Sequence, residues 1–370
     1  MKHRAYVYDR GGKDRIGELT QKMLVRWDRD RDDISAATVT VDNPNSDCTD
    51  LLNKIEPGRH ELVIFRNGKR VWEGPITLPT FDRYSVSIEA HDVWHYSYRT
   101  IMHRAYNNAY PHISSAVSRV TNILRQELVR KETLDPPINV LPHYRPYEIP
   151  GVARTSRSTK KYESTVWEEI DDMAAKGGID YTAVGRATLV WDTHMPLSTT
   201  RVVTEKDFTN DITVSAYGME LATRTAVTDG LGRYGVAGGI DPYYGEWEVL
   251  NTAYQENEVD PTAQHIPQRD LDAQAKRNLV GRVPTPVVVR VPDNSSLTPA
   301  AVEELFDFLV PGVWVPLRAS STVRQVEQMQ KIDSLRFEET EAGEAVTIVM
   351  SPAPGSSPLG DDAADQPEDE

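Results

Sequence analysis

The segment Glu61–Gly74, "ELVIFRNGKRVWEG", constrains the fold of this chain more than any other stretch. Two apolar runs flank Asn67-Gly68, and these two residues tolerate the positive φ angles that a tight type I′ turn demands. The segment therefore predicts an antiparallel hairpin with Trp72 in the core. The stretches "SAATVTVD" and "YSVSIEA" alternate strictly and predict two further strands.

A short pattern from this region returns near the C-terminus. "LLNKIEPG" ends at Pro57-Gly58, and "LFDFLVPG" ends at Pro311-Gly312. Both have two large apolar residues, an aliphatic residue three positions later, Pro-Gly and then an apolar segment. We interpret the chain as two related β units, each a small barrel or sandwich. The open alternative is that eight residues match by chance.

Between these units the apolar spacing changes from two residues to three and four. "HISSAVSRVTNILRQELVRKE" predicts one amphipathic helix, and "STVWEEIDDMAAKGG" predicts a second, with a capping box at Thr165 and Glu168 and an end at Gly177-Gly178. The proline-rich "LDPPINVLPHYRPYEIPG" between them predicts a loop, and "IDYTAVGRATLVWD" predicts a hairpin. The buried stripe of the first helix is expected to hold Ile113, Ala116, Val117, Val120, Ile123, Leu124 and Leu128.

Two helices are expected in the second half of the chain. One lies near Arg269–Leu279. Thr298 caps the other, Pro299 suits its first position, and Pro311 stops it. The buried face of this second helix is expected to hold Val302, Leu305, Phe306 and Leu309.

These patterns predict a β-rich α+β chain: two tail-tube-like β barrels with an inserted α+β domain, the likeness to a tail tube resting on the resemblance given below. The predicted parts are a first barrel at residues 1–98, completed by about 201–225, an insert at 99–200, a second barrel with helices at 226–352, and an acidic tail at 353–370. The tail has six carboxylates, no basic residue and no large apolar residue after Leu359, so disorder is expected.

Charge limits the function classes that fit. The formal net charge is −15, and the chain without its tail still carries −9. Tight nucleic-acid binding relies on cations that neutralise phosphates, so this balance argues against it. No apolar run approaches the roughly 18 residues of a membrane span, and the single cysteine, Cys48, excludes an internal disulfide.

Three patterns resemble chemical sites, and none has the necessary context. Gly230, Gly232 and Gly235 have dinucleotide-site spacing, but we expect a loop around them rather than the required strand and helix. "DRDRDD" lacks the Gly and Glu of a calcium loop and predicts a solvated turn. "HDVWH" offers no third and fourth zinc ligand and predicts a polar strand end. We therefore expect no metal, no cofactor and no catalytic residue.

Aromatic residues gather in a glycine-rich segment that we predict to be a loop from Asp229 to Trp247. Tyr234, Tyr243, Tyr244 and Trp247 crowd this segment. Exposed aromatic side chains often serve as contact residues, so we interpret them as a protein-contact loop, with sugar binding as the alternative.

The order of these parts resembles that of tail hub proteins, the baseplate-hub-like minor tail proteins of long-tailed siphovirus bacteriophages of actinobacteria. The resemblance covers most of residues 1–352, and the order of the segments carries it more than any single motif. It rests on "FRNGKRVWEGPI", "SIEAHDVWHYSYRTI", "ESTVWEEIDDMAAKGGIDYTAV", "LVPGVWVPLRA" and "EETEAGEAVTIVM".

The resemblance implies a structural virion protein made in the host cytoplasm and placed at the distal tail tip. A homotrimer with two tube-like barrels in each chain would form a ring of six barrels, joining a sixfold tail tube to a threefold tip. The implied partners are distal tail and tail tube proteins, the tape measure protein and a tail-tip or central fibre protein. Phage DNA would pass transiently, without specific binding, through a channel with acidic walls. Larger members add a C-terminal peptidase, lysin or fibre region; this sequence ends in the acidic tail, so we expect no enzyme.

Two other function classes stay open at this point. A receptor- or glycan-binding tail-tip protein would use the aromatic segment near Tyr243. A cell-wall hydrolase would need a carboxylate pair, and the sequence singles out none.

Overall fold

The computed structural model describes most of the chain in detail. The described residues are 2–12, 14–106, 116–128, 145–149, 159–175, 179–193, 197–216, 218–252, 268–279, 282–283, 287–291 and 295–353. Ile113, Gly177-Gly178 and the predicted acidic tail beyond Ala353 lie outside them.

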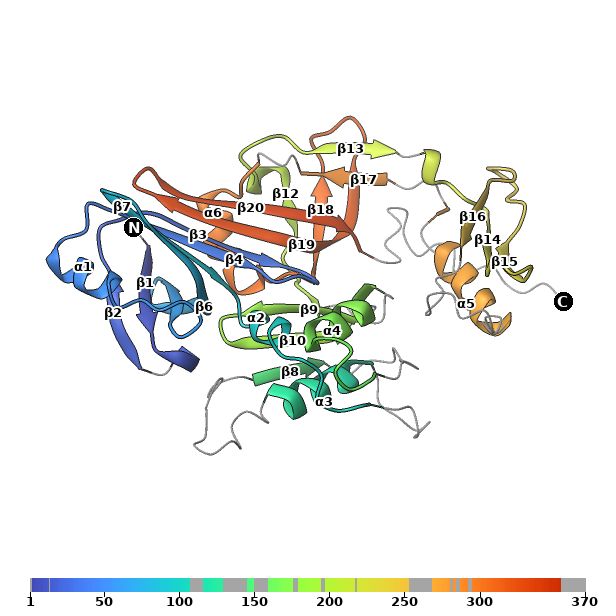
Figure 1. The fold of residues 1–370 in the computed structure, drawn as a ribbon. Coiled ribbons are helices and arrows are strands. Elements are labelled where there is room, and N and C mark those ends of the chain that lie inside the picture. Colours follow the sequence, from blue (N-terminus) through green and yellow to red (C-terminus); the bar gives the residue numbers. More distant parts are fainter. Residues whose placement is uncertain are drawn as a thin grey trace.

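One twelve-stranded sheet dominates the molecule (Figure 1). Its strand order is β11-β18-β19-β3-β4-β7-β6-β5-β1-β2, with β12 paired to β18 and β20 paired to β19. The part from residue 3 to 91, here the N-terminal unit, contains β1 (His3–Tyr8), β2 (Arg15–Leu19), β3 (Lys22–Asp30), β4 (Ala36–Asp42), α1 (Ser46–Leu52), β5 (Glu61–Arg66), β6 (Lys69–Phe81) and β7 (Ser85–His91).

The C-terminal unit comprises residues 197–216 and 287–353. Its elements are β11 (Leu197–Ser198), β12 (Val203–Thr204), β13 (Thr213–Ala216), β17 (Val287–Arg290), α6 (Pro299–Leu305), β18 (Val313–Ala319), β19 (Val326–Thr340) and β20 (Gly343–Pro352). The segment 201–225 was predicted to complete the first unit, but β12 pairs with β18 and β13 pairs with β17. These short strands carry no sequence signal that would assign them to one unit.

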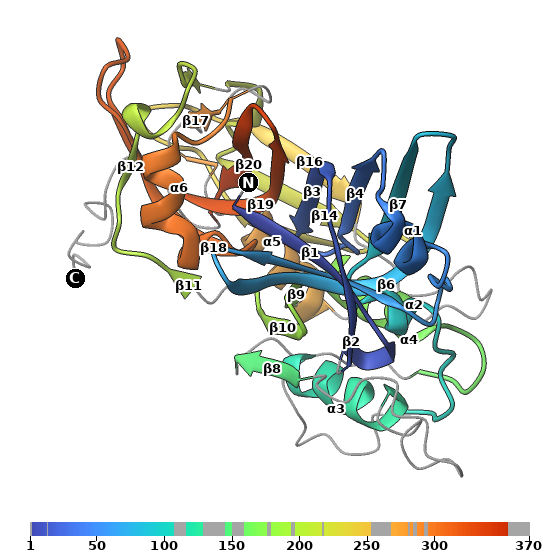
Figure 2. The ribbon, with the colours of Figure 1, turned by 90° about the vertical axis from the view of Figure 1, so that its left-hand side faces the viewer.

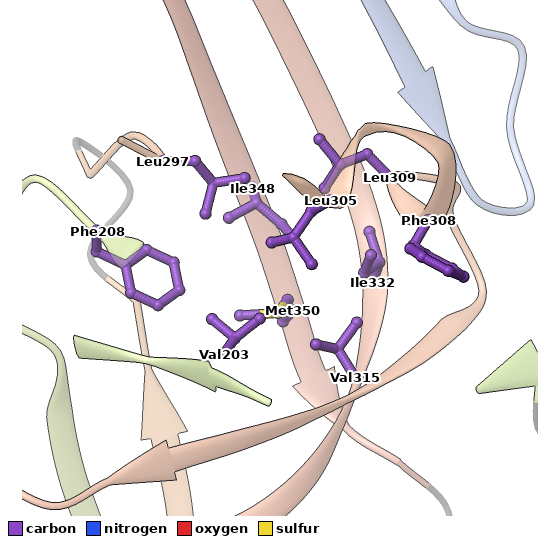
Figure 3. Close-up of a pocket in the computed structure, with 10 residues that line it drawn as sticks. All are labelled: Val203, Phe208, Leu297, Leu305, Phe308, Leu309, Val315, Ile332, Ile348 and Met350. Atoms are coloured by element: carbon purple, nitrogen blue, oxygen red, sulfur yellow. The ribbon is translucent and has the colours of Figure 1, made fainter. Parts of the chain in front are cut away.

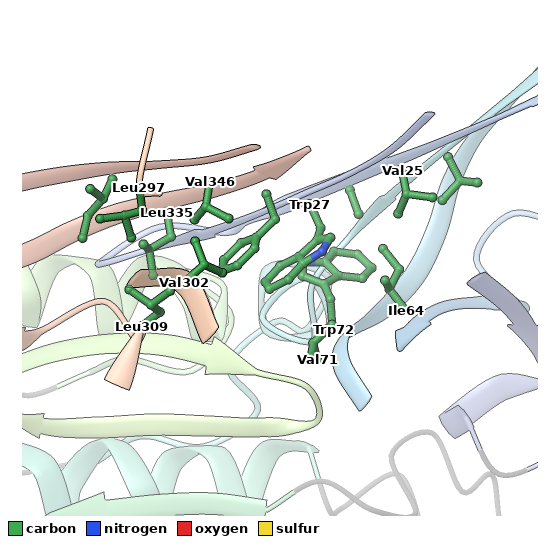
Figure 4. Close-up of a cluster of buried hydrophobic side chains, with 14 of the residues drawn as sticks. Val25, Trp27, Ile64, Val71, Trp72, Leu297, Val302, Leu309, Leu335 and Val346 are labelled. Atoms are coloured by element: carbon green, nitrogen blue, oxygen red, sulfur yellow. The ribbon is translucent and has the colours of Figure 1, made fainter. Parts of the chain in front are cut away.

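Both units share one hydrophobic core. Within it the rings of Trp27 and Phe337 stack face to face, with centroids 3.9 Å apart, and Figure 4 shows Trp27 among the other buried side chains of this core. Trp72 is 2 % exposed beside them, as predicted. Strand pairing among the described residues follows an open path, so the closure of each unit into a barrel stays a prediction.

The strongest local predictions are confirmed. Asn67 and Gly68 have φ angles of 49° and 80°, and they join β5 to β6 as a tight hairpin. Gly74 packs so closely on β7 that an added Cβ would lie 1.7 Å from the carbonyl oxygen of His91. Thr298 caps α6 by accepting the N–H of Ala301. That helix ends at Leu305 and continues as a 3-10 turn, earlier than predicted.

The insert lies below the main sheet in Figure 1 and has its own apolar core. The capping box at Thr165 and Glu168 is present. Residues 145–149, predicted as loop, form a strand that pairs with β10. The insert contains α2 (His95–Tyr98), α3 (Ala116–Leu128), β8 (Arg145–Ile149), α4 (Val166–Ala175), β9 (Ile179–Val184) and β10 (Ala187–Asp192).

A small outlying subdomain, residues 218–283, is inserted between β13 and β17 and stands apart from the main sheet (Figure 1). Its elements are β14 (Arg224–Thr228), β15 (Tyr234–Gly238), β16 (Glu248–Thr252) and α5 (Gln268–Leu279). The predicted loop from 229 to 247 therefore contains a strand, because β15 pairs with β14 and packs under α5.

Candidate functional site: an open strand edge and an aromatic surface

The two Pro-Gly segments have the same backbone role in the two units. Gly58 and Gly312 have φ angles of 74° and 88°. The N–H of Gly58 donates to the carbonyl of Ile76 in β6 at 2.8 Å, and the N–H of Gly312 donates to the carbonyl of Ile332 in β19 at 2.7 Å. Each glycine follows a capped helix and precedes a strand, so the pattern seen in the sequence marks a structural repeat.

The strands that follow repeat as well. In each unit a long strand pairs first with the strand after Pro-Gly and then with the next strand: β6 with β5 and β7, β19 with β18 and β20. Both ladders shift register at the matching place, between Ile76 and Leu78 and between Ile332 and Ser334. A β-bulge at the same position in both units shows that the repeat extends beyond the eight matched residues.

Inside the chain, β3 fills one edge of β19. It pairs antiparallel from Leu24 opposite Thr340 to Asp30 opposite Ser334, on the edge that β18 uses further along β19. The N–H of Arg31 then donates to the carbonyl of the bulged residue Asp333 at 2.9 Å. This pairing joins the N-terminal unit to the C-terminal unit.

The matching edge of β6 is open among the described residues. β5 covers this edge only up to Pro75, and the ladder with β7 uses the other edge from Ile76 to Phe81. Leu78 is 52 % exposed and Phe81 is 54 % exposed there. Figure 2 shows the β6–β7 hairpin, in blue-green, projecting beside α1. Long uncovered strand edges invite pairing with another chain.

The repeat also contains a second open edge. β13 pairs with β17 as β3 pairs with β4, but within the described residues β13 has no partner on its other side. Each chain therefore has one strand that matches β3 and one strand edge that matches the acceptor edge of β19. Among the described residues, the free edge of β13 and this edge of β6 both lack a partner strand.

The face of the main sheet away from the core is polar. Arg26 and Asp28 alternate on β3 with Val25 and Trp27 of the core, and Arg336 reaches Asp28 at 3.3 Å. On β3, on β7 and on the part of β19 beyond its bulge, this face holds four carboxylates and two arginines and is moderately acidic there: Arg26, Asp28, Asp30, Glu89, Arg336 and Glu338.

A buried charge cluster joins the insert to both units. Asp180 of β9 pairs with Lys331 of β19, and with Arg31 at 3.0 Å. Arg31 also pairs with Asp333 at 2.6 Å. Asp32 accepts the N–H of Tyr181 at 2.9 Å, and burial and the Asp180 charge raise the pKa of Asp32 above its ordinary value. The prediction of a solvated turn at "DRDRDD" was therefore wrong: Asp28–Asp30 end β3, Arg29 is buried, and Arg31 and Asp32 form a joint with the insert.

A second polar joint lies where the insert meets β5 and β6. Arg186 of the insert donates to Glu73 and to the carbonyl of Gly12. Glu61 accepts the hydroxyl proton of Tyr96, and burial, followed by the nearby Glu73, raises the pKa of Glu61. The sequence did not reveal either joint, because the partners are more than 100 residues apart or belong to different elements.

The aromatic segment lies on the outlying subdomain and is strongly exposed. Tyr243 is 87 % exposed, Tyr234 65 % and Trp247 52 %. Tyr244 packs edge-on against Tyr243 with ring centroids 4.8 Å apart. Because α5 covers the other face of this small sheet, the aromatic side chains have no cover within the described part of the chain.

None of the remaining candidates forms a chemical site. No group of three or more His, Cys, Asp or Glu residues in the described parts of the chain is arranged to hold a metal ion. Asp92 is buried and accepts the N–H groups of Ser35 and Trp94, which makes it a turn-forming residue. No described helix is long and apolar enough to cross a bilayer.

Two hollows lie among the described residues of the main sheet. The first is small and lined only by apolar side chains between α6, β19 and β20, without a group that could bind or transfer a proton (Figure 3). The second is open, with a volume of about 580 Å³, on β1 and its neighbours. Arg15 lies 4.6 Å from the Tyr6 ring centroid there, which gives this surface a basic and aromatic character.

Comparison with solved structures identifies the fold. The 43 kDa tail protein of prophage MuSo2 from Shewanella oneidensis superposes with a TM-score of 0.58 at 11 % identity, covering 96 % of this chain and 100 % of that one. Prophage tail protein gp18 from Listeria monocytogenes EGD-e gives 0.56 at 10 % identity, with 95 % of both chains covered. The tail protein from Neisseria meningitidis MC58 gives 0.54 at 10 % identity, covering 95 % and 96 %.

No protein-family profile matches the sequence, and no curated protein matches it. The structural likeness therefore shows the fold, a β-rich fold shared with phage tail proteins. Restriction to siphoviruses of actinobacteria stays a prediction.

Proposed function

We propose that this protein is a structural component of a phage tail and forms a trimeric hub. Three solved tail proteins share its fold over nearly the whole length of both chains, which supports a tail protein. The shared fold with solved tail proteins also supports a structural role rather than a catalytic one. We accordingly propose that the protein is not an enzyme.

The single observation that carries the hub proposal is that the strand pairing seen between β3 and β19 has no counterpart at the matching edge of β6 among the described residues. Within the chain, β3 pairs with β19; between chains, β13 of one copy would pair with the matching edge of β6 in the next. The four residues of β13 fit the open stretch Thr77–Phe81 in length. A head-to-tail contact generates a ring where its rotation closes, and three chains with two units each would give six units around one axis.

In this ring the polar face of the main sheet would line the channel. The edge pairing between chains would close the sheets of neighbouring copies into a barrel. Carboxylates such as Asp28 and Glu338 would repel passing DNA, so DNA would slide without specific binding. The sixfold face would meet distal tail and tail tube proteins and the tape measure protein, and the threefold face would meet a tail-tip or central fibre protein. The proposed location is the distal end of the tail in the virion.

The test is the mass of the full-length protein by light scattering, with electron-microscope images of the same peak. The proposal expects rings with about three times the 41.6 kDa mass of one chain. Leu78→Lys places a charge on the open β6 edge and should reduce the mass to that of one chain. Val349→Lys is the matched control, because Val349 is 43 % exposed on β20, a strand that takes no part in the proposed pairing. A trimer that survives Leu78→Lys contradicts edge pairing.

A second function is favoured by the exposed aromatic side chains of the outlying subdomain. Tyr243 and Trp247 have the character of sugar-binding residues, so the alternative is a receptor- or cell-wall-glycan-binding tail-tip protein. Sedimentation of the protein with host cell walls, lost on Tyr243→Ala and Trp247→Ala together, would support it.

A further inference from the structure

The outlying subdomain occupies an informative place in the repeat. In the N-terminal unit, β3 and β4 are joined by the short turn Arg31–Ser35. In the C-terminal unit, β13 and β17 are joined instead by the whole subdomain. The turn Arg31–Ser35 and the subdomain therefore occupy matching places in the repeat. The contacts of the turn indicate what the subdomain would contact if β13 pairs as β3 does.

The turn is anchored at the joint between units. The N–H of Arg31 binds the carbonyl of the bulged residue Asp333, and the backbone of Ser35 exchanges hydrogen bonds with Asp92 just before α2. If β13 pairs with a neighbouring copy's β6 in the same register, the bulged residue Thr77 of that copy takes the place of Asp333. The subdomain then begins beside Thr77 and α2 of the neighbour.

A row of aromatic rings leads away from Thr77. The hydroxyl of Thr77 lies 3.1 Å from Nδ1 of His91. The His91 ring stacks on His95 at 5.3 Å between centroids, His95 lies 6.0 Å from Tyr98, and Tyr98 lies 5.8 Å from Trp167. Burial lowers the pKa of His95 to about 4, so its ring is neutral at neutral pH.

The row ends on an exposed surface. Tyr98 is 44 % exposed and Ile101 is 51 % exposed. The ring row and the subdomain therefore present aromatic side chains to solvent on both sides of the same joint. Tyr and Trp dominate the well-packed centres of protein interfaces.

Charged side chains border both surfaces. Glu246 and Glu248 lie on either side of Trp247, with side chains 44 % and 61 % exposed, and both pair with Arg224 of the same subdomain. Arg99 is exposed next to Tyr98. Because Arg224 balances part of the negative charge, the matching strand positions of the repeat, rather than charge, indicate a second copy of this chain as the partner of the aromatic surface.

We infer that the aromatic surface of the outlying subdomain, centred on Tyr243 and Trp247, packs on the His91–Tyr98 ring row of the neighbouring copy. The insert thus closes the joint between the two units of one chain, and the subdomain closes the joint between chains. This inference rests on the proposed ring.

The test places the photo-cross-linking residue p-benzoylphenylalanine at position 243 of the full-length protein. After irradiation, cross-links between two chains should map to residues 91–101 or 159–167. The same probe at position 323, which replaces the fully exposed Val323 of the C-terminal unit, should give no cross-link to those residues.

Matched variants then test the contact. With the probe at 243, Tyr98→Glu should reduce the cross-link yield at least about tenfold, as loss of one interface anchor of over 1.4 kcal/mol would. Phe308→Glu should leave the yield unchanged, because Phe308 has the same 44 % exposure at another place. A trimer without these cross-links overturns the contact and leaves the ring. A protein that is monomeric at every concentration overturns both.

Discussion

The N-terminal and C-terminal units share one repeated backbone frame, made of a helix, a Pro-Gly segment and three paired strands. They differ in the segments that pack on this frame. In both, a capped helix leads through Pro-Gly to a strand, and a bulge lies at Ile76 or Ile332 of the long strand. In the C-terminal unit the edge beyond the bulge is filled by β3, whereas in the N-terminal unit no strand among the described residues covers it. A repeated frame can therefore supply a contact within the chain in one copy and a contact between chains in the other.

The surroundings of the frame differ as strongly. Gly312 packs against the Trp191 ring of the insert, while Gly58 has open space around its Cα. Burial raises the pKa of Glu61 in β5 and of Asp92 directly after β7. In the C-terminal unit, cationic partners lower the pKa of Glu303 and Glu344 instead. Matched changes in the two units can separate the frame from its environment.

The largest effect is expected from alanine at the two glycines. An added Cβ at Gly312 would lie 1.9 Å from the Trp191 ring, and the φ of 88° is unfavourable for alanine. Overpacking and the left-handed backbone together should lower the free energy of unfolding by about 4 kcal/mol. Gly58→Ala meets only the backbone penalty and should lose about 1 kcal/mol. Urea unfolding measures the free energy of unfolding of both variants. Equal losses would show that the shared backbone conformation, and not the Trp191 contact, sets the cost of alanine.

The next effect concerns the charge that ties the C-terminal unit to the insert. Lys331→Met should lower the free energy of unfolding by about 3 kcal/mol, because it leaves the Asp180 carboxylate buried with one cation fewer. Arg318→Met removes the exposed pair with Glu327 and should lose under about 1 kcal/mol. Similar losses in the two variants would contradict a buried joint.

Rising pH should weaken the N-terminal unit first, because Asp92, directly after β7, accepts the N–H of Ser35 just before β4. Burial raises the pKa of Asp92 to about 7, above the roughly 4 of an unfolded carboxyl. The folded state therefore holds the proton longer, and stability is lost as pH rises from about 4 to 7, by about 2 kcal/mol between pH 5 and pH 7. Amide exchange in β4 and β7 should quicken more than in β18. Asp92→Asn should remove this difference, and its persistence would assign it to other groups.

The smallest effect is expected in the connections after β5 and β18. Asn67→Ala should lower the free energy of unfolding by about 1 kcal/mol, because alanine tolerates its φ of 49° poorly. Val323→Ala, in the longer connection before β19, should change it by less than about 0.5 kcal/mol, since Val323 is fully exposed. Thermal unfolding of both variants gives the comparison, and an equal loss would show that turn chemistry does not set the register of the N-terminal unit.

The sequence by itself determined the features that depend on neighbours along the chain. The turn at Asn67-Gly68, the caps at Thr165 and Thr298 and the stripe of α3 follow from local backbone and side-chain chemistry, and they are present. The eight-residue pattern around Pro-Gly also pointed to a true repeat. The tertiary structure shows that the repeat extends beyond these eight residues, because the two bulges lie at matching positions.

Only the tertiary structure decided which segments meet across long distances. Nothing local in Leu24–Asp30 predicts pairing with a strand 300 residues later, and nothing local in Asp180 predicts Lys331 as its partner. The placement of β12 beside β18 and the strand within the predicted aromatic loop were missed for the same reason. Strand register and buried ion pairs depend on the packing of the whole molecule, because a strand's pattern specifies its face and not its neighbour.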